Sequence, residues 1–382
     1  MSSKLICNIG QLVTNSSRDL GIIENAAFVI ENGKVAWVGE NKNAPECDQK
    51  IDAEGGVVTP GFVDSHTHAV FAGDRHKDYV ARMSGTKYAS GGIRTTVEAT
   101  RSASFEELTS LTKSTIDRSF NSGTTTIEIK SGYGLDIETE VKILKVAKQF
   151  TNETTFLGAH VLPNEFSENR RAYVDLVKRE MLNACAPFAK WIDVFCDESA
   201  FSVDEAREIL VAGISKGLHG RIHGNQIADS GGADLAAELQ LASVDHCTHV
   251  SDKTISKIAE AGVVATLLPG AEFFTKSPYP NGQRYLDAGV EVALASDCNP
   301  GSSYITSMPI VMGLAVREMN LSPAQVLYAA TKGGAKALRR SDVGHLNIGA
   351  RADFVIWQAP TFEHITYRLG EIHREVFSSK SF

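Results

Sequence analysis

The middle of the chain alternates short apolar runs with amphipathic stretches, and this alternation limits the fold more than any other feature. The apolar runs are GFVDSHTH (61–68), TTTIEIK (124–130), TTFLGAH (154–160), WIDVFC (191–196), RIHGN (221–225), SVDHC (243–247), VVATLLP (263–269) and EVALASD (291–297). Strands that alternate with helices form a parallel sheet, and eight such units can close into a (β/α)8 TIM-type barrel. We therefore expect an α/β barrel over residues 58–339.

A doubly wound open sheet is the alternative arrangement of the same elements. Such sheets commonly bind dinucleotides at a G-x-G-x-x-G motif between a strand and a helix. The nearest match begins at Gly132, but Ile137 stands where the third glycine belongs. The barrel is therefore the favoured arrangement. Serines followed three residues later by Glu or Gln predict helix starts at Ser104, Ser202 and Ser322.

The two ends of the chain have a different pattern from the middle. Residues 1–57 contain β-branched runs separated by turns, and Asn32-Gly33 between two of these runs is typical of a two-residue hairpin turn. The stretch 344–360 returns to the same pattern. We expect residues 1–57 and 340–382 to form one small composite β-sandwich domain. Two unrelated additions to the barrel would fit the pattern equally well.

Charge and cysteine content exclude several classes of protein. Lys and Arg total 38 against 46 Asp and Glu, so no basic surplus exists to bind nucleic acid. The longest apolar run, 263–271, is far shorter than the roughly 18 residues of a membrane span. The N-terminus lacks a signal-peptide pattern, and the six cysteines form no C-x-x-C pair. We expect a cytoplasmic protein with a small-molecule substrate; the sequence leaves open whether it forms a homodimer.

Residues able to bind a metal gather at the ends of the apolar runs. His66 and His68 form an H-x-H pair, and side chains two apart on a strand point to the same side. Such a pair alone is more often two exposed histidines. Further runs end at His160, His223, His246 and Asp297. In a barrel these ends meet on one face, where active sites lie.

Three imidazoles and a carboxylate suit zinc or iron and leave a position for water. We expect one Zn2+ or Fe3+ per chain, held by four ligands: His66, His68, His223 and Asp297. His246 would be a free imidazole beside the water; the alternative is a buried histidine bonded to its neighbours. A metal lowers the pKa of water to near ~7 and polarises a carbonyl. With His246 and Asp297 carrying protons, the pattern predicts hydrolysis at a carbon bonded to nitrogen.

The chain resembles the amidohydrolase superfamily in two segments, GFVDSHTH (61–68) and the closing strand in GHLNIGARADFVIW (344–357). Within it, the chain is similar to the imidazolonepropionase family over nearly its whole length. The similar segments are HTHAVFAGDR (66–75), GTTTIEIKSGYGL (123–135), FLGAH (156–160), SVDHC (243–247), LLPG (267–270) and SDCNPGSS (296–303). The resemblance implies hydrolysis of 4-imidazolone-5-propanoate to N-formimidoyl-L-glutamate in histidine degradation.

The resemblance also implies a set of substrate-binding residues. Arg75 would hold the propionate carboxylate, a role that suits its planar fork of donors. The others would line the pocket or contact substrate: Tyr88, Tyr133, His160, Gln226, Asn299, Gly301 and Ser302. For Arg75 and the tyrosines, ordinary packing or surface roles are the alternative.

One position departs from part of the family. Gln226 stands where some members carry an acidic residue, and an amide can hydrogen-bond the substrate but cannot carry a proton. The proton transfers then fall to His246 and Asp297. Gln226 also disfavours an amino-heterocycle deaminase, which would use a glutamate there. A binuclear site would need a bridging lysine, which WIDVFCDES (191–199) lacks. A non-catalytic barrel scaffold would have lost a metal ligand, and all four candidates are present.

Overall fold

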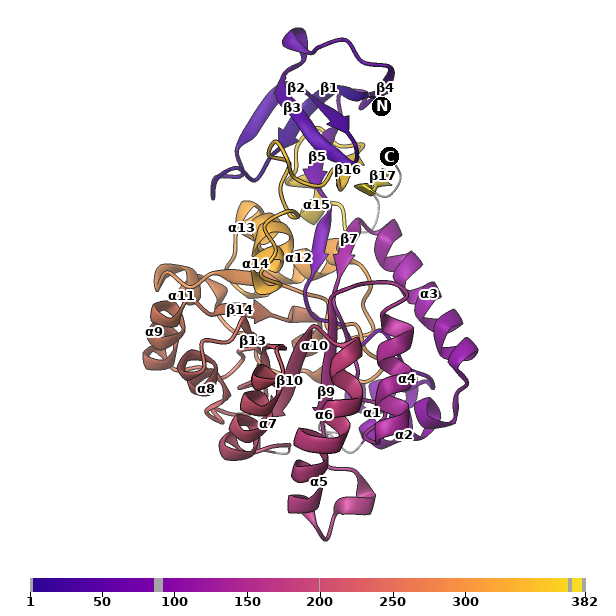
Figure 1. Cartoon of the computed structure of the whole chain (residues 1–382). Coiled ribbons are helices and arrows are strands. Elements are labelled where there is room, and N and C mark those ends of the chain that lie inside the picture. Colours follow the sequence, from indigo (N-terminus) through magenta and orange to yellow (C-terminus); the bar gives the residue numbers. More distant parts are fainter. Residues whose placement is uncertain (1–2, 86–91, 199, 370–372, 380–382) are drawn as a thin grey trace.

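A small sheet built from both ends of the chain lies at one end of a larger barrel of strands and helices (Figure 1). The computed structural model describes residues 3–85, 92–198, 200–369 and 373–379. Among these residues, none of the helices combines the length and apolar character needed to cross a membrane.

Each of the eight predicted runs contains a strand of the barrel. These strands are β6 (Phe62–Asp64), β7 (Thr124–Ile127) continued by β8 (Ile129–Lys130), β9 (Thr154–Ala159), β10 (Trp191–Cys196), β12 (Ile222–Gly224), β13 (Ser243–His246), β14 (Val264–Leu267) and β15 (Val292–Leu294). Neighbours pair in parallel, and the short β11 (His219–Gly220) also pairs with β10. A parallel bridge between Thr67 and Cys298 joins the segments that follow β6 and β15. The predicted α/β barrel is thereby confirmed.

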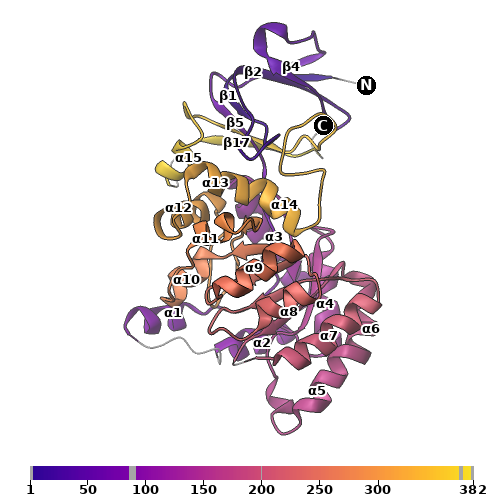
Figure 2. The ribbon, with the colours of Figure 1, turned by 90° about the vertical axis from the view of Figure 1, so that its left-hand side faces the viewer.

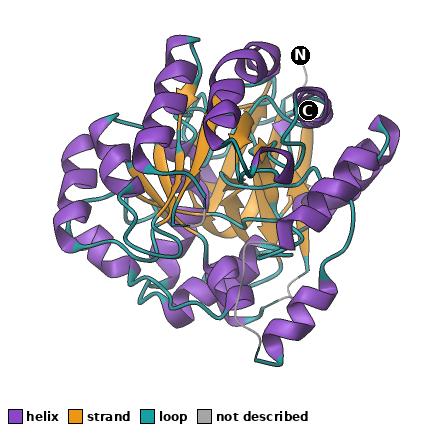
Figure 3. Cartoon of the chain, turned by 90° about the horizontal axis from the view of Figure 1, so that it is seen from below, coloured by secondary structure: helices purple, strands orange, loops and turns teal. Residues whose placement is uncertain are grey.

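Helices surround the strands of the barrel (Figure 3). The α-helices among the described residues are α1 (His76–Met83), α2 (Ile93–Ser102), α3 (Phe105–Asn121), α4 (Ile137–Ala147), α5 (Arg170–Leu176), α6 (Leu182–Cys185), α7 (Val203–Ser215), α8 (Gly232–Glu238), α9 (Asp252–Ala261), α10 (Pro269–Thr275), α11 (Gly282–Asp287), α12 (Met308–Glu318), α13 (Pro323–Tyr328), α14 (Gly334–Ala337) and, between β16 and β17 of the small sheet, α15 (His364–Tyr367). Ser202 and Ser322 form complete capping boxes with Glu205 and Gln325, as predicted. At the start of α3, the Ser104 side chain accepts a hydrogen bond from the backbone nitrogen of Glu107, but the capping box is not completed.

The small sheet combines strands from both ends of the chain in the order β17-β16-β5-β1-β2-β3, with β4 on β1. Its strands are β1 (Lys4–Val13), β2 (Ile22–Glu31), β3 (Lys34–Glu40), β4 (Gln49–Asp52), β5 (Val57–Pro60), β16 (Phe354–Trp357) and β17 (Arg374–Phe377). Asn32 and Gly33 make the predicted hairpin turn, both with positive φ. The rings of Phe28 in β2 and Phe354 in β16 lie 5.1 Å apart although two strands separate β2 from β16 in the sheet. This contact shows that the sheet curls on itself.

The path of the chain places the small sheet away from the carboxyl ends of the barrel strands. Strand β5 of the small sheet leads within two residues into β6 of the barrel, so the sheet lies at the amino end of β6. Helices α1 and α2, which follow the carboxyl end of β6, lie farther from the small sheet than α12, α13 and α14 do (Figure 2). On this arrangement we propose the same two domains, residues 1–57 with 340–382 and residues 58–339, although β5 continues to Pro60.

Candidate active site

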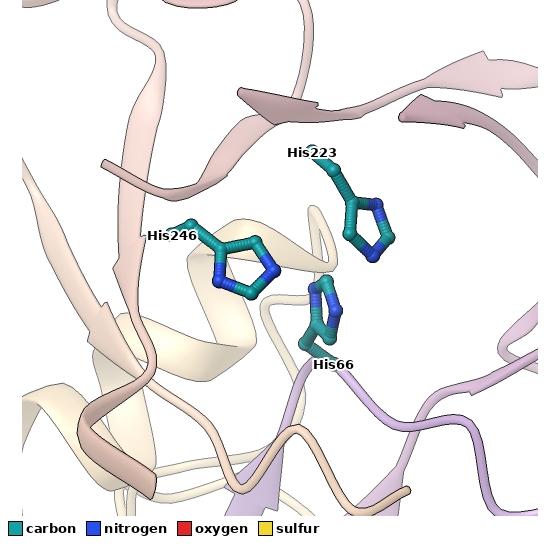
Figure 4. Close-up of side chains that lie close together, drawn as sticks. All are labelled: His66, His223 and His246. Atoms are coloured by element: carbon teal, nitrogen blue, oxygen red, sulfur yellow. The ribbon is translucent and has the colours of Figure 1, made fainter. Parts of the chain in front are cut away.

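Four buried histidines and a buried aspartate meet at the carboxyl ends of the barrel strands. His66 and His68 follow β6, His223 lies in β12, His246 ends β13, and Asp297 follows β15. Nε2 of His66 lies 3.5 Å from Asp297 Oδ1, and Nε2 of His68 lies 3.6 Å from the same oxygen. The rings of His66, His223 and His246 come from three separate segments and point toward one another (Figure 4). The barrel therefore brings together the residues that the sequence singled out.

The donor atoms of this cluster fit a metal ion. Two sets of three residues have ligand atoms within 4.8 Å of one another: His66, His223 and His246, and His66, His68 and Asp297. Nε2 of His66 is fully buried and has no hydrogen-bond partner among the described residues. Buried polar atoms are nearly always satisfied, and a metal would satisfy this one. The four predicted ligands lie together, while the role of His246 outside the ligand set stays a prediction.

Two buried carboxylates hold the rings of this cluster from behind. Asp245 Oδ2 lies 2.7 Å from Nδ1 of His66, and Asp193 Oδ2 lies 3.0 Å from Nδ1 of His223. A carboxylate on one ring nitrogen fixes the orientation of an imidazole and directs its other nitrogen outward. Both rings thus present Nε2 to the centre of the cluster.

Two buried cations hold these carboxylates in turn. Lys130 Nζ lies 2.9 Å from Asp193 Oδ2 and 3.0 Å from Glu128 Oε1, and Arg221 Nη2 lies 2.9 Å from Asp245 Oδ2. Burial alone would raise the pKa of Asp193, but His223 and Lys130 outweigh it and hold that pKa well below its usual range. For Asp245, Arg221 and Lys130 likewise outweigh burial and lower the pKa. Both carboxylates are therefore ionised.

These supporting residues were missed by the sequence reasoning. Glu128, Lys130, Asp193, Arg221 and Asp245 all lie in or beside the apolar runs and are buried in the barrel. Charged residues are rarely buried without partners. A charge inside a run predicted to be a buried strand was therefore the available signal for an internal network.

The backbone is unusual at the two predicted proton carriers. His246 has φ +81° and Asp297 has φ +50°, in the left-handed region that residues other than glycine seldom adopt. Such conformations cost roughly 1–3 kcal/mol and are concentrated at functional sites. Burial, with a smaller effect of nearby His223, holds the pKa of His246 well below its ordinary value. The imidazole of His246 is therefore neutral.

A pocket opens beside the cluster and contains most of the predicted substrate-binding residues. His68, His223, His246 and Asp297 line one part of it, and Ile93, Val161 and Phe195 add an apolar surface that the sequence reasoning missed. The predicted residues that line it are Arg75, Tyr133, His160, Gln226, Asn299, Gly301 and Ser302. Tyr88 lies outside the described residues. Whether any of these side chains contacts a substrate stays a prediction.

His160 presents a hydrogen-bond acceptor within this pocket. Its ring stacks on His68 at 5.0 Å between centroids, and its Nδ1 lies 2.9 Å from the carbonyl oxygen of Gly132. Because a carbonyl can only accept, Nδ1 carries the hydrogen and donates. Burial, followed by the nearby His223, lowers the pKa of His160 to about 3. The ring is therefore neutral, and its Nε2 is an acceptor.

Asn299 shapes the loop that follows the last barrel strand. Its amide nitrogen donates to the carbonyl of Asp297 at 2.7 Å, and its Oδ1 accepts from the backbone nitrogens of Gly301 and Ser302 at 2.8 and 2.7 Å. The side chain is thus engaged within the loop. Its contribution to the pocket is to position the backbone around Gly301.

The chain is similar to known proteins over most of its length. The amidohydrolase family matches residues 57–372. The chain is 54% identical to the imidazolonepropionase of Mycolicibacterium smegmatis over 97% of this chain and 94% of that protein. It is 55% identical to the imidazolonepropionase of Salinispora arenicola, over 97% of this chain and 96% of that protein.

Solved structures with a similar fold include a triazine hydrolase variant, with a TM-score of 0.75 at 17% identity over 99% of this chain and 93% of that one. The guanine deaminase of C. acetobutylicum has a TM-score of 0.68 at 18% identity, over 92% of this chain and 90% of that one. At such low identity these structures show a shared fold and nothing about the reaction.

Proposed function

The chain belongs to the imidazolonepropionase family of amidohydrolases, hydrolases of histidine degradation that act on a cyclic amide, and we propose that its substrate is 4-imidazolone-5-propanoate. Water adds to the ring carbonyl carbon, the bond from this carbon to the ring nitrogen breaks, and the product is N-formimidoyl-L-glutamate. The observation that supports this most directly is that one pocket contains both the histidine–aspartate cluster and a buried arginine.

We propose that His66, His68, His223 and Asp297 hold one Zn2+ or Fe3+ ion. When bound, such an ion makes water nucleophilic near neutral pH and polarises a carbonyl group. The support for this ligand set is the ring orientation that Asp245 and Asp193 impose, and the unpartnered Nε2 of His66 among the described residues.

His246 and Asp297 carry the protons in this proposal. In this proposal the imidazole of His246 accepts a proton as water attacks the ring carbonyl carbon. The proton is then delivered to the ring nitrogen as the carbon–nitrogen bond breaks, so the former carbonyl carbon becomes a carboxylate carbon. Gln226 lines the pocket and can hydrogen-bond the ring, but it cannot take a share of the proton transfer.

Arg75 and His160 would orient the substrate relative to these groups. The guanidinium of Arg75 can hold the propionate carboxylate through two parallel hydrogen bonds. Nε2 of His160 can accept a hydrogen bond from a ring N–H of the substrate. With both ends held, the ring carbonyl is aimed at the cluster, as a hydrolytic step requires.

Turnover of imidazolonepropionate by metal-reconstituted protein tests this proposal. The protein is stripped with a chelator, given one equivalent of zinc or iron, and assayed by the loss of ultraviolet absorbance of the substrate. Activity should return with one metal per chain, and a decarboxylated analogue should be a much poorer substrate. No turnover with either metal would favour the alternative that the protein is a non-catalytic scaffold. Equal turnover of the analogue would contradict the substrate assignment.

A panel of neutral amino-heterocycles separates the proposed reaction from deamination. A deaminase would release ammonia from these compounds faster than it opens imidazolonepropionate. We expect no ammonia release, because Gln226 stands where a deaminase would use a glutamate.

A further inference from the structure

Asp78 binds one edge of the Arg75 guanidinium. Arg75 is the residue directly before helix α1, and Asp78 follows three residues later within that helix. Nε of Arg75 donates to Asp78 Oδ2 at 2.7 Å. The Arg75 side chain is 6% exposed, whereas that of Asp78 is 42% exposed. A surface carboxylate therefore holds a buried arginine that faces the pocket.

Two glycines leave room for the other edge of the guanidinium. A Cβ on Gly301 would lie 2.2 Å from Nη1 of Arg75, and a Cβ on Gly92 would lie 2.2 Å from Nη2. Both distances are too short for real atoms, so any side chain there would displace the arginine. Among the described residues, Nη1 and Nη2 of Arg75 have no hydrogen-bond acceptor. This edge of the fork is therefore left for a ligand in the pocket.

Helix α1 also secures the loop that packs on Arg75. Arg82 Nη2 donates to the carbonyl of Gly301 at 2.5 Å. Asp78 and Arg82 are four residues apart in α1, so they lie on the same face of the helix. One short helix thus sets the position of the guanidinium directly and the position of the Gly301 loop beside it.

We propose that Asp78 is a positioning residue that aligns Arg75 to bind the substrate carboxylate. This inference rests on the proposed function, in which Arg75 holds the propionate. By accepting the Nε hydrogen, Asp78 turns the Nη1–Nη2 edge toward the pocket, the edge that binds a carboxylate through two parallel hydrogen bonds. The negative charge of Asp78 itself opposes an anionic substrate, but its exposure lets solvent screen that effect. The benefit of Asp78 is therefore alignment and not charge.

Steady-state kinetics of two Asp78 variants of the holoenzyme distinguish alignment from charge. Asp78→Ala removes the acceptor, so KM for imidazolonepropionate should rise about tenfold, the scale of one intramolecular hydrogen bond. The kcat, the metal content and the kinetics with the decarboxylated analogue should stay within twofold of wild type. Asp78→Asn keeps an oxygen acceptor without the charge, so its KM should stay close to that of wild type. Asp74→Ala is the matched control, because Asp74 is exposed and, among the described residues, bonds only to His76.

A double variant separates alignment of Arg75 from a general structural role. With Arg75 removed, Asp78 has nothing to align, so Arg75→Ala/Asp78→Ala should have the same KM as Arg75→Ala alone. Equal increases in KM for Asp78→Ala and Asp78→Asn would overturn the inference, and so would additive effects in the double variant. If KM is unchanged in Asp78→Ala but raised in Arg75→Ala, the positioning role of Asp78 is rejected and the carboxylate-binding role of Arg75 is not. An unchanged KM in Arg75→Ala would reject the carboxylate-binding role in the proposed function as well.

Discussion

The two ends of the pocket are built in opposite ways. At the end proposed to bind metal, here called the metal end, His66 and His223 lie at barrel strands, and the carboxylates and cations behind them are fully buried. At the end proposed to bind the substrate carboxylate, here called the carboxylate end, Arg75 lies at the start of a short helix, its partner Asp78 is 42% exposed, and the adjoining segments are loops. One end is part of the barrel interior and the other belongs to its rim.

This difference separates the reaction from the choice of substrate. Removing one partner from a buried charge network leaves the others unpaired in a medium of low polarity, which is strongly destabilising. We therefore expect the metal end to tolerate little change, and in the proposed function it sets the class of reaction. The carboxylate end is partly solvated, so we expect changes there to alter binding and to leave the cluster intact. The following experiments test this contrast.

Removal of an imidazole at the metal end should have the largest effect. His66→Ala and His223→Ala each delete a proposed ligand and leave Asp245 or Asp193 without its histidine. Metal binding and turnover should both be lost, as measured by elemental analysis and by the ultraviolet assay. Wild type should hold one metal per chain. A wild-type protein that needs two metals per chain for activity would contradict the mononuclear site.

His246→Ala should impair the reaction while the metal stays bound. If His246 carries protons and is not a ligand, turnover should fall by roughly 10² or more at unchanged metal content. His249→Ala is the matched control, because His249 is in the same segment but does not line the pocket. Loss of metal together with activity would place His246 among the ligands and revise the assignment.

Asp193→Asn tests the support behind the ligands. The change keeps the shape of the side chain but removes the charge between His223 and Lys130, so metal affinity should fall by roughly 10–100-fold. Competition with a chelator measures this. Asp78→Asn, at the other end of the pocket, should leave metal affinity unchanged. Similar losses in both variants would remove the contrast between the two ends.

Arg75→Ala should have an effect that is confined to substrate binding. Substrate binding should weaken by roughly 1.5–3 kcal/mol, the scale of a hydrogen bond between charged groups, with metal content unchanged. Arg75→Lys should recover only part of this, because an ammonium keeps the charge and loses the fork. The KM for the charged substrate and for its decarboxylated analogue checks both expectations. Equal losses on the two compounds would show that Arg75 does not bind the carboxylate.

Most of the barrel and much of the site could be predicted from local sequence. The strands follow from short apolar runs, and the metal-binding residues stand at the ends of those runs. A strand end is a local property, and parallel strands in a barrel must bring such ends together. The segments that resemble the imidazolonepropionase family then predicted that Arg75 and the loop around Asn299 belong to the same site as these metal-binding residues. The roles of all these residues stay predictions, and Tyr88 lies outside the described residues.

The sequence by itself determined which residue types stand at the strand ends, and therefore the kind of chemistry that the pocket can perform. Only the tertiary structure decided which charges pair beneath them. His66 and Asp245 are 179 residues apart in the chain and 2.7 Å apart in space, a pairing that depends on barrel closure. The contact of Asp78 with Arg75 was also decided by the tertiary structure. Asp78 is only three residues from Arg75, but its side chain could have pointed to solvent. Gly92 and Gly301 pack on the Nη atoms of the Arg75 guanidinium, so the Nε side is left to Asp78. Periodicity and motif are local and can be read along the chain, whereas partners across a barrel are set by strand register and packing.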